Sequence, residues 1–441
     1  MPIIRRFKKR CGKVILFAAP PLAGKVIVMR NVKDYGAVGD GAALDTKAIQ
    51  KAIDLGGTVY IPEGVYRVGT LYLRSNGGLH LAAGATLLAS HERKDYNSDD
   101  FCVQNVVSAS EKVTGAHLIC AIEQENITIE GHGTIDGQGD FWMNKSNTQP
   151  GWPNADDRDY APNENRPGQM IFICECNNVH VTDVNIVNGP YWHLFFHGCD
   201  NVHARGLKIK GDLPRWTNDG IDIDCCSRVT VSDCVIEVGD DAITLRGHDA
   251  PLKTQKKCEK ITVTNCVLYS HRDYGIRIGV GDGLICDCVI SNVTIDAPNY
   301  VGIGMLGRWS DTSRTVSSIE NICISNVNIH SRCPLEICAA YGEKPLAHAC
   351  YIRNIMMNNI MLFTGKRNII KGFPGAALEN VILGNVILQP DKNADKKVFQ
   401  ISSAEGVLLD NIKIVGEDNA GERICFDNCK NSEVHIERIE C

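Results

Sequence analysis

The sequence predicts an all-β protein whose strands stack into a parallel β-helix, a solenoid with one capping helix at its N-terminal end. Short segments rich in β-branched residues recur through most of the chain. Most of them have a polar pair before a first strand and Asn, Asp or Gly before a second. A period of about 20–50 residues made of β-type units is typical of a solenoid or a propeller.

The repeat has a measurable period. Aligned segments start at intervals of 23, 27, 32, 61, 33 and 26 residues, and the interval of 61 divides if a coil begins near Gly283. Propeller blades need hairpin turns such as Asn-Gly, which are scarce here, so a parallel β-helix with coils about 4.8 Å apart fits better. An ordinary β-sandwich remains the alternative. The aligned starts are Asn178, Asn201, Arg228, Lys260, Asn321, Asn354 and Asn380.

A helix is expected over residues 45–54, before the repeats. Asp45 is its predicted N-cap, and Gly56-Gly57 is expected to end it. A cap of this kind covers the apolar core that the end of a solenoid exposes. One face of the predicted helix is apolar: Ala48, Ile49, Ala52 and Ile53.

Composition and charge exclude some functions. The chain has 441 residues, 46 basic and 52 acidic, for a net charge of −6. No long basic run follows the first ten residues, so no nucleic-acid partner is expected. No apolar run approaches the ~20 residues that span a membrane. We expect a basic and apolar extension over residues 1–28 and one catalytic β-helix domain over residues 29–441, in an unknown oligomeric state.

The N-terminal extension and the cysteines bear on the compartment. The stretch MPIIRRFKKRCGKVILFAAPPLAG resembles a secretory signal, but its apolar run is short and contains Pro20-Pro21. Many of the 20 cysteines fall inside the repeated segments, where a free thiol serves as a small buried apolar group. We therefore expect reduced thiols and a cytoplasmic protein, with a secreted or periplasmic one as the alternative.

Three aspartates are predicted to meet on one face of the solenoid. Asp240 and Asp241 stand at the entrance of the strand in VGDDAITLRGH, and Asp219 lies 21 residues earlier in WTNDGIDIDCC, close to one coil. Glycoside hydrolysis needs one protonated carboxyl and one ionised carboxylate, which crowded acids supply. Asp222 and Asp224 also face outward, and we assign them to backbone contacts rather than to catalysis.

These segments resemble glycoside hydrolase family 28, the polygalacturonases and their relatives, which are right-handed single-stranded parallel β-helices. The resemblance runs from Asp34 to the C-terminus. It rests on DYGAVGDG with DTKAIQKAID, on GGTVYIPEGVY, on NGPYWHLFFHGCDNV and above all on NDGIDID and VGDDAITL.

The resemblance implies roles for individual residues. Asp240 would be the general acid, and Asp219 and Asp241 would hold and activate the water. It also implies inversion at the anomeric carbon, with acid and base carboxyls about 6.5–9.5 Å apart. No metal or organic cofactor is implied. Trp192 and His193 match a family position near the cleft.

Two departures from the family pattern affect substrate binding. In RDYGIRIG, Tyr274 replaces the histidine of the family's Gly-His-Gly, and His271 is a possible substitute. In VGIGMLGR, Gly304 and Leu306 replace the Arg and Lys that grip a uronate, which leaves a gap beside an apolar side chain. The residues expected to contact substrate are therefore Trp192, His193, Arg246, His271, Tyr274, Arg277 and Arg308.

The function that the sequence favours is an inverting glycosidase of pectin-type or related plant polysaccharide fragments. We expect exo action on oligosaccharides, an altered grip that suits a neutral or deoxy sugar, and a loop over residues 140–166 that closes one end of the cleft. One alternative is a β-helix polysaccharide lyase, with Asp219, Asp240 and Asp241 holding calcium. The other is a carbohydrate-binding β-helix without activity, although such a surface does not need a proton donor.

Overall fold

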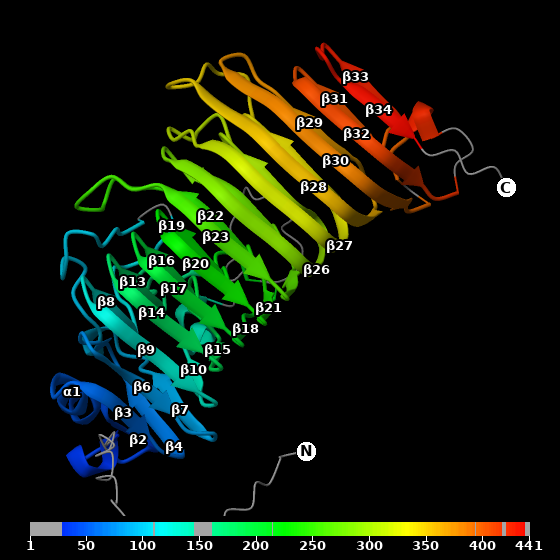
Figure 1. The fold of residues 1–441 in the computed structure, drawn as a ribbon. Coiled ribbons are helices and arrows are strands. Elements are labelled where there is room, and N and C mark those ends of the chain that lie inside the picture. Colours follow the sequence, from blue (N-terminus) through cyan, green and yellow to red (C-terminus); the bar gives the residue numbers. More distant parts are fainter. Residues whose placement is uncertain are drawn as a thin grey trace, which may run out of the picture.

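The computed structural model describes residues 29–108, 111–144, 161–213, 215–392, 394–416 and 420–436. The predicted extension over residues 1–28 and most of the predicted loop over residues 140–166 lie outside them. The strands stack from the N-terminus to the C-terminus into one long, curved body (Figure 1). The main sheet has 32 strands, and its pairings between consecutive coils are parallel. The predicted parallel β-helix is confirmed.

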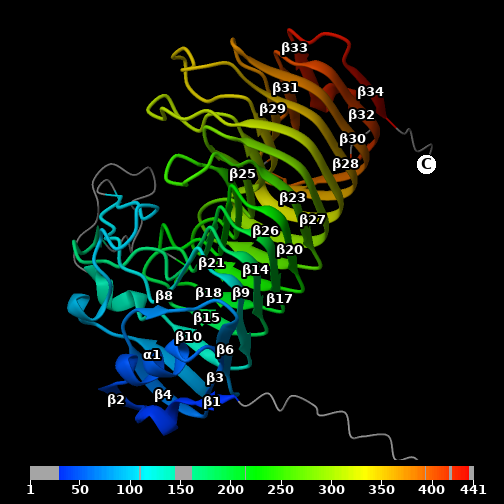
Figure 2. The same ribbon diagram turned by 60° about the vertical axis from the view of Figure 1, so that its left-hand side comes forward.

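Each coil contributes to three faces, which Figure 2 shows from the side. The first face, called here the site sheet, begins with β5 (Leu71–Tyr72), β8 (Ile119–Ile122), β13 (Ile171–Cys174), β16 (Leu194–His197), β19 (Ile221–Asp224), β22 (Ile243–Gly247) and β25 (Ile276–Gly281). It ends with β29 (Asn368–Lys371), β31 (Phe399–Ser402) and β33 (Ile424–Asp427).

The second face contains β1 (Arg30–Asn31), β3 (Gly57–Ile61), β6 (Gly77–Leu81), β9 (Glu125–Gly131), β14 (Asn177–Thr182), β17 (Asp200–Arg205), β20 (Ser227–Ser232) and β23 (Cys258–Thr264). The third contains β2 (Asp40–Leu44), β4 (Gly64–Val68), β7 (Ala85–Ala89), β10 (Thr134–Asp136), β15 (Asn185–Val187), β18 (Lys208–Lys210), β21 (Val235–Val238) and β24 (Val267–Ser270).

In the later coils, long strands run without a break from one face of the solenoid into the next. They are β26 (Leu284–Leu306), β27 (Ser318–Cys338), β28 (Cys350–Thr364), β30 (Ala376–Pro390) and β32 (Glu405–Ile414), with β34 (Glu433–Ile436) on the last coil. Short elements outside the stack are the 3₁₀ turns η1 (Val32–Tyr35), η2 (Arg93–Asp95), η3 (Gly139–Trp142) and η4 (Ala420–Arg423), and the antiparallel pair β11 (Met143–Asn144) and β12 (Ala161–Pro162).

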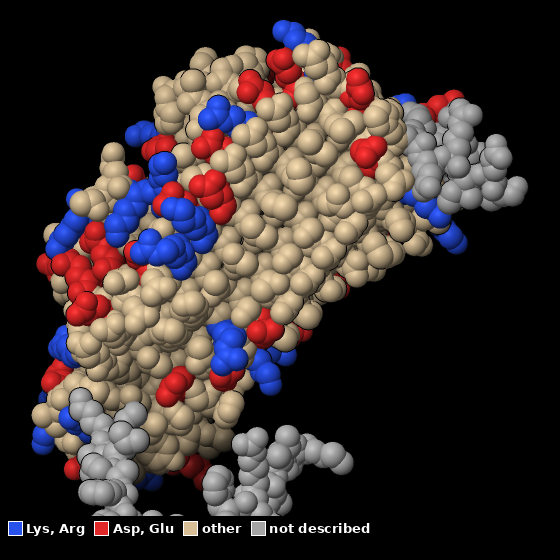
Figure 3. Space-filling model, in the orientation of Figure 1, with Lys and Arg blue, Asp and Glu red and all other residues tan. Residues whose placement is uncertain are grey.

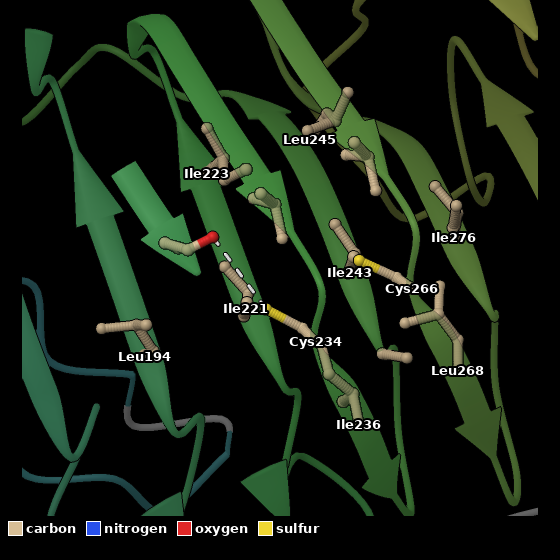
Figure 4. Close-up of a cluster of buried hydrophobic side chains, with 14 of the residues drawn as sticks. Leu194, Ile221, Ile223, Cys234, Ile236, Ile243, Leu245, Cys266, Leu268 and Ile276 are labelled. Atoms are coloured by element: carbon tan, nitrogen blue, oxygen red, sulfur yellow. Dashed lines mark hydrogen bonds between the residues drawn. The ribbon is translucent and has the colours of Figure 1, made fainter. Parts of the chain in front are cut away.

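Alternation along each strand sends one set of side chains into the core. Ile221 of β19 lies in register with Ile243 of β22, and Ile223 lies in register with Leu245. These side chains are fully buried and point inward, as Figure 4 shows. Cys234 and Cys266 are buried in the same core, which confirms the expected use of cysteine as a small apolar residue.

The aligned starts of the repeat are a turn position. All seven have positive φ angles between 53° and 57°. Asp287 has a φ of 56° and supplies the start that divides the interval of 61 residues. Asparagine tolerates this left-handed conformation, and its amide bonds to the same position of the preceding coil. Asn321 donates to Asp287 at 2.9 Å, and Asn354 donates to Asn321 at 3.0 Å.

The capping helix is present as α1 (Thr46–Asp54), with Ile49, Ala52 and Ile53 buried. Asp45 is the N-cap residue, as predicted, but its side chain makes no bond to the helix. Its carboxylate accepts the amides of Val38 and Gly39 at 2.7 and 3.0 Å and so fixes the preceding loop. No helix in the described residues is long and apolar enough to cross a membrane.

Charged side chains are unevenly distributed. Figure 3 shows a broad face that carries few Lys, Arg, Asp or Glu side chains, with the charges gathered along its margins. Outward positions of the second sheet, such as Thr230, Thr262 and Val289, are uncharged and follow one another in register. The acidic residues of the predicted site instead belong to the coils of the site sheet.

Candidate active site

Stacking brings Asp219, Asp240 and Asp241 together, as predicted. Asp219 lies two residues before β19, and Asp241 lies two residues before β22, which pairs directly with β19. One carboxylate oxygen from each residue lies within 4.8 Å of the others. Asp219 and Asp241 are 2% and 1% exposed, whereas Asp240 is half-buried.

Backbone amides hold Asp240 in a fixed turn. Its two carboxylate oxygens accept the amides of Asp241, at 3.0 Å, and Thr217. The side-chain oxygen of Asn218 accepts the amides of Gly239 and Asp240, at 2.9 and 3.1 Å. Asn218 therefore fixes the turn that presents Asp240, a role that the sequence analysis did not assign.

Asp241 is held at both oxygens. One accepts the amide of Tyr274 at 3.0 Å, and the other accepts the hydroxyl of Thr244 and the guanidinium of Arg277, both at 3.3 Å. A carboxylate with these partners has little freedom to move toward a substrate.

Arg246 joins Asp219 to Asp222. It donates to Asp219 at 3.0 Å and to Asp222 at 2.7 Å, and its guanidinium lies 4.0 Å from the centre of the Trp192 ring. Arg246 and Trp192 were expected to contact substrate, but Arg246 is committed to the two buried acids and Trp192 covers it. Of the two neighbouring acids assigned to backbone contacts, Asp224 accepts the amide of His248, whereas Asp222 pairs with Arg246.

Asp273 is a further carboxyl that the sequence analysis missed. It lies in the turn before β25, and its side chain shares a hydrogen bond with Asp240. Its sequence signal is an acid in RDYGIRIG, one coil after GDD and directly before Tyr274.

The charge balance requires protons in this cluster. Five carboxyls, of Asp219, Asp222, Asp240, Asp241 and Asp273, surround two guanidinium groups. Burial and repulsion from Asp240 raise the pKa of Asp219 well above its usual range. Burial and Asp241 raise the pKa of Asp240 to about 6, and burial raises the pKa of Asp222 to about 7. Protonated and ionised acids therefore coexist near neutral pH.

Some buried polar atoms of the acid cluster have no hydrogen-bond partner. Within the described residues, one oxygen each of Asp219, Asp222 and Asp273 and the Nε of Arg277 are buried and make no hydrogen bond. Buried polar atoms in folded proteins are normally satisfied. The acid cluster therefore keeps hydrogen-bonding capacity that its protein neighbours do not use.

Two residues expected at the cleft are inside the fold instead. His193 is fully buried; its Nε2 accepts the amide of Gly189 at 3.0 Å and its Nδ1 lies 2.8 Å from the carbonyl of Asp219. Burial lowers the pKa of His193 to about 4. Arg308 is 3% exposed and donates to the carbonyls of Tyr341 and Pro345. His193 therefore positions the backbone of Asp219, and Arg308 fixes a distant loop.

His271 and Tyr274, the two candidates for the place of the family histidine, both contact other protein side chains. The Nδ1 of His271 lies 3.2 Å from the hydroxyl of Tyr269 on β24. Tyr274 is 4% exposed, and its hydroxyl donates to Glu336 at 3.1 Å. Sequence spacing placed both residues in the right coil, but it did not show where their side chains turn.

The expected gap at Gly304 is filled. A Cβ at this position would lie 2.3 Å from the ring of Tyr274, so the ring occupies the space beside the glycine. Leu306 is 1% exposed and packs in the same apolar cluster. Gly304 thus makes room for the ring of Tyr274, and Leu306 packs in the same cluster, so the two residues do not open a pocket for an apolar sugar.

The carboxyl groups approach one another closely. One oxygen of each of the three acids lies within 4.8 Å of the others. Adjacent coils allow this approach, because coils are only about 4.8 Å apart.

The three oxygens also form a group that suits a hard cation such as Ca²⁺, the chemistry of the lyase alternative. However, Asp219 and Asp241 already have arginine partners, which compete with a metal ion. A second group, of Glu259, Cys286 and Asp287, lies on the second sheet and away from these acids.

Comparison with known proteins agrees with this geometry. Residues 59–389 match the model of glycosyl hydrolases family 28, and residues 29–81 match the model "Rhamnogalacturonase A/epimerase, pectate lyase-like". An exo-poly-alpha-D-galacturonosidase of Dickeya chrysanthemi is 30% identical over 316 residues, which are 62% of this chain and 51% of that protein. The chain spans about half the length of the curated relatives it matches first.

Solved structures share the fold. A family 28 exopolygalacturonase of Yersinia enterocolitica superposes with a TM-score of 0.69 at 21% identity, covering 93% of this chain and 79% of that one. A hyperthermoactive exopolygalacturonase of Thermotoga maritima gives 0.68 at 22% identity, covering 88% and 92%. These similarities confirm the right-handed single-stranded parallel β-helix.

Proposed function

The chain belongs to glycosyl hydrolases family 28, and on that premise we propose that it is an inverting, exo-acting hydrolase of pectin-type oligosaccharides. The observation that carries the proposal is the cluster of Asp219, Asp240 and Asp241 around one small space. The names of its relatives support galacturonan as the substrate class and exo action as the mode.

Asp240 is the general acid in this proposal. It is half-buried, so it reaches substrate more easily than Asp219 and Asp241, which are at most 2% exposed. Its pKa of about 6 suits proton donation in mildly acidic solution. The leaving oxygen receives the proton of Asp240 as the glycosidic bond breaks.

Asp219 and Asp241 hold the attacking water. Both oxygens of Asp241 already accept hydrogen bonds, whereas one oxygen of Asp219 has no partner among the described residues. In the ionised form of Asp219, which Arg246 favours, that oxygen accepts a proton as the water adds to the anomeric carbon. Inversion follows when this water, and not a carboxylate, bonds to the anomeric carbon from the side opposite the leaving oxygen.

Arg277 replaces the family's uronate grip. On the site sheet, Arg277 lies in register with Thr244 of the preceding coil and with Gly304 of the next coil. Its guanidinium lies beside Asp241, and its side chain is 15% exposed. A guanidinium with free donors binds a carboxylate strongly. This position supports an acidic sugar rather than the neutral or deoxy sugar that the sequence suggested.

Arg277→Gln should lower kcat/KM for oligogalacturonate by roughly 10- to 100-fold, because a charge-assisted hydrogen bond is worth about 1.5–3 kcal/mol. The loss should be several-fold smaller on methyl-esterified oligosaccharides, which carry no carboxylate. Steady-state kinetics on both substrates measure the difference, with the exposed Arg314→Gln as the control. Equal losses on the two substrates would mean that Arg277 acts only through Asp241.

Product analysis tests the function as a whole. Galacturonan, rhamnogalacturonan and neutral-sugar oligosaccharides are each incubated with the protein, and products are followed by mass spectrometry and ultraviolet absorbance. Saturated products are expected from galacturonan. Unsaturated products that depend on calcium would make the protein a lyase, and binding without turnover would make it a carbohydrate-binding β-helix.

We further propose a cytoplasmic location with reduced thiols. The support is that 18 cysteines of the described residues are free, most of them buried in the stacked core. Protein purified without reductant and then denatured should therefore titrate about 20 thiols, one for each cysteine of the chain. A count lower by two or more would indicate disulfides and favour the secreted or periplasmic alternative.

A further inference from the structure

Asp273 lies against the proposed general acid. Its side chain shares a hydrogen bond with that of Asp240, and its other oxygen, Oδ1, is buried without a partner among the described residues. Two carboxylates cannot share a hydrogen bond unless a proton lies between them. The geometry therefore requires at least one proton in this pair.

The turn that carries Asp273 is fastened to the turn that carries Asp240. The hydroxyl of Ser270, which is fully buried, donates to the carbonyl of Asp240 at 2.7 Å and accepts the amide of Asp273 at 3.2 Å. The amide of Arg272 donates to the carbonyl of Gly239 at 2.9 Å. These bonds tie the two chain segments together, so the contact between the two carboxyls follows from the backbone.

The surroundings of Asp273 disfavour its ionisation. The titratable groups that face it are Asp240 and Asp241 from the turn before β22, Arg277 from β25, and Tyr274 and Tyr300. The two acids repel a negative charge on Asp273, and Arg277 attracts it. Burial is the largest influence and acts against the charged form.

We propose that Asp273 is a positioning residue that shares one proton with Asp240 and so keeps Asp240 in its acid form at the start of each turnover. This inference rests on the proposed function in one respect, the assignment of Asp240 as the general acid. When Asp240 passes its proton to the leaving oxygen, the water bonds to the anomeric carbon and gives its proton to Asp219. The pair then carries two negative charges side by side, which draws a proton back from solvent.

Asp273→Asn separates this role from a merely structural one. The amide has nearly the same shape, but it removes one negative charge and donates a hydrogen bond to the ionised form of Asp240. The alkaline limb of the kcat pH profile should therefore move to lower pH by about one unit, a tenfold change in proton affinity. Asp273→Ser, which also removes the charge, should move the limb in the same direction. The exposed Asp282→Asn is the control and should leave it in place.

A second measurement does not depend on turnover. An acid whose pKa is raised by folding destabilises the fold as pH rises from its unfolded pKa, about 4, toward its folded one. Asp273→Asn removes this penalty, so its Tm relative to the unaltered protein should rise between pH 4 and pH 8. An unmoved pH limb together with a Tm difference that is constant with pH would overturn the inference. Failure to hydrolyse any substrate would overturn the proposed function but not the shared proton.

Discussion

Asp240→Asn is expected to lower kcat by about 10²- to 10⁴-fold with little change in KM, since a general acid contributes this much to a rate. The amide is close in size and can still accept one of the two amide bonds that hold Asp240, from Thr217 and Asp241. It has no acidic proton for the leaving oxygen. Steady-state kinetics on oligogalacturonate measure the loss.

The leaving group provides the decisive comparison for Asp240. A nitrophenyl glycoside departs without a proton, so Asp240→Asn should lose far less activity on that substrate than on the oligosaccharide. Asp224→Asn is the matched control, because Asp224 also accepts a backbone amide, that of His248, but has no place in the mechanism. An equal loss on both substrates would show that Asp240 is not the acid.

Arg246→Met should have the largest effect on stability. Removing Arg246 leaves Asp219 and Asp222, which are 2% and 0% exposed, without their cation. Breaking one side of a buried ion pair costs about 3–5 kcal/mol. Urea unfolding should show this loss near neutral pH. The partly exposed pair of Arg353 and Glu320 supplies the control, since Arg353→Met should cost less than about 1 kcal/mol.

The loss in Arg246→Met should depend on pH in a defined direction. Burial already raises the pKa values of Asp219 and Asp222, and loss of the guanidinium raises them further. A raised carboxyl pKa destabilises the fold progressively as pH rises above the unfolded value of about 4. The variant should therefore be closest to the unaltered protein near pH 4 and furthest from it at pH 8. A difference that is the same at both pH values would contradict the role of Arg246 as the cation that favours the ionised forms of Asp219 and Asp222.

Periodicity made the fold predictable from the sequence. The aligned starts mark a turn that recurs once per coil, and left-handed φ angles at Asn178, Asn321 and their equivalents explain why polar residues occupy it. Once the coil length is known, register follows, and register alone brings Asp219 to Asp240 and Asp241. The N-cap residue Asp45 was also predictable, but not that its carboxylate bonds to the preceding loop, because the local pattern does not reveal this contact.

Side-chain direction at the site was less predictable. Spacing shows that Tyr274 lies in the coil after GDD, but only three-dimensional packing shows that its ring fills the space beside Gly304. The sequence predicted that His193 and Arg308 contact substrate. In the structure, His193 contacts the backbone carbonyl of Asp219, and Arg308 donates to that of Tyr341. Asp273 was missed because its partner, Asp240, belongs to another coil and only the turn geometry at Ser270 brings them together.

The most direct test of the whole account is the anomeric configuration of the first product. Oligogalacturonate, an α-linked substrate, is incubated with the protein inside an NMR tube, and the anomeric protons are followed before mutarotation. The account predicts a saturated sugar that appears first as the β-anomer, as attack of an activated water requires. First appearance of the α-anomer would mean retention through a covalent intermediate, the outcome that goes with closely spaced carboxyl groups in glycosidases. That result would contradict the assignment of Asp219 and Asp241 to a water.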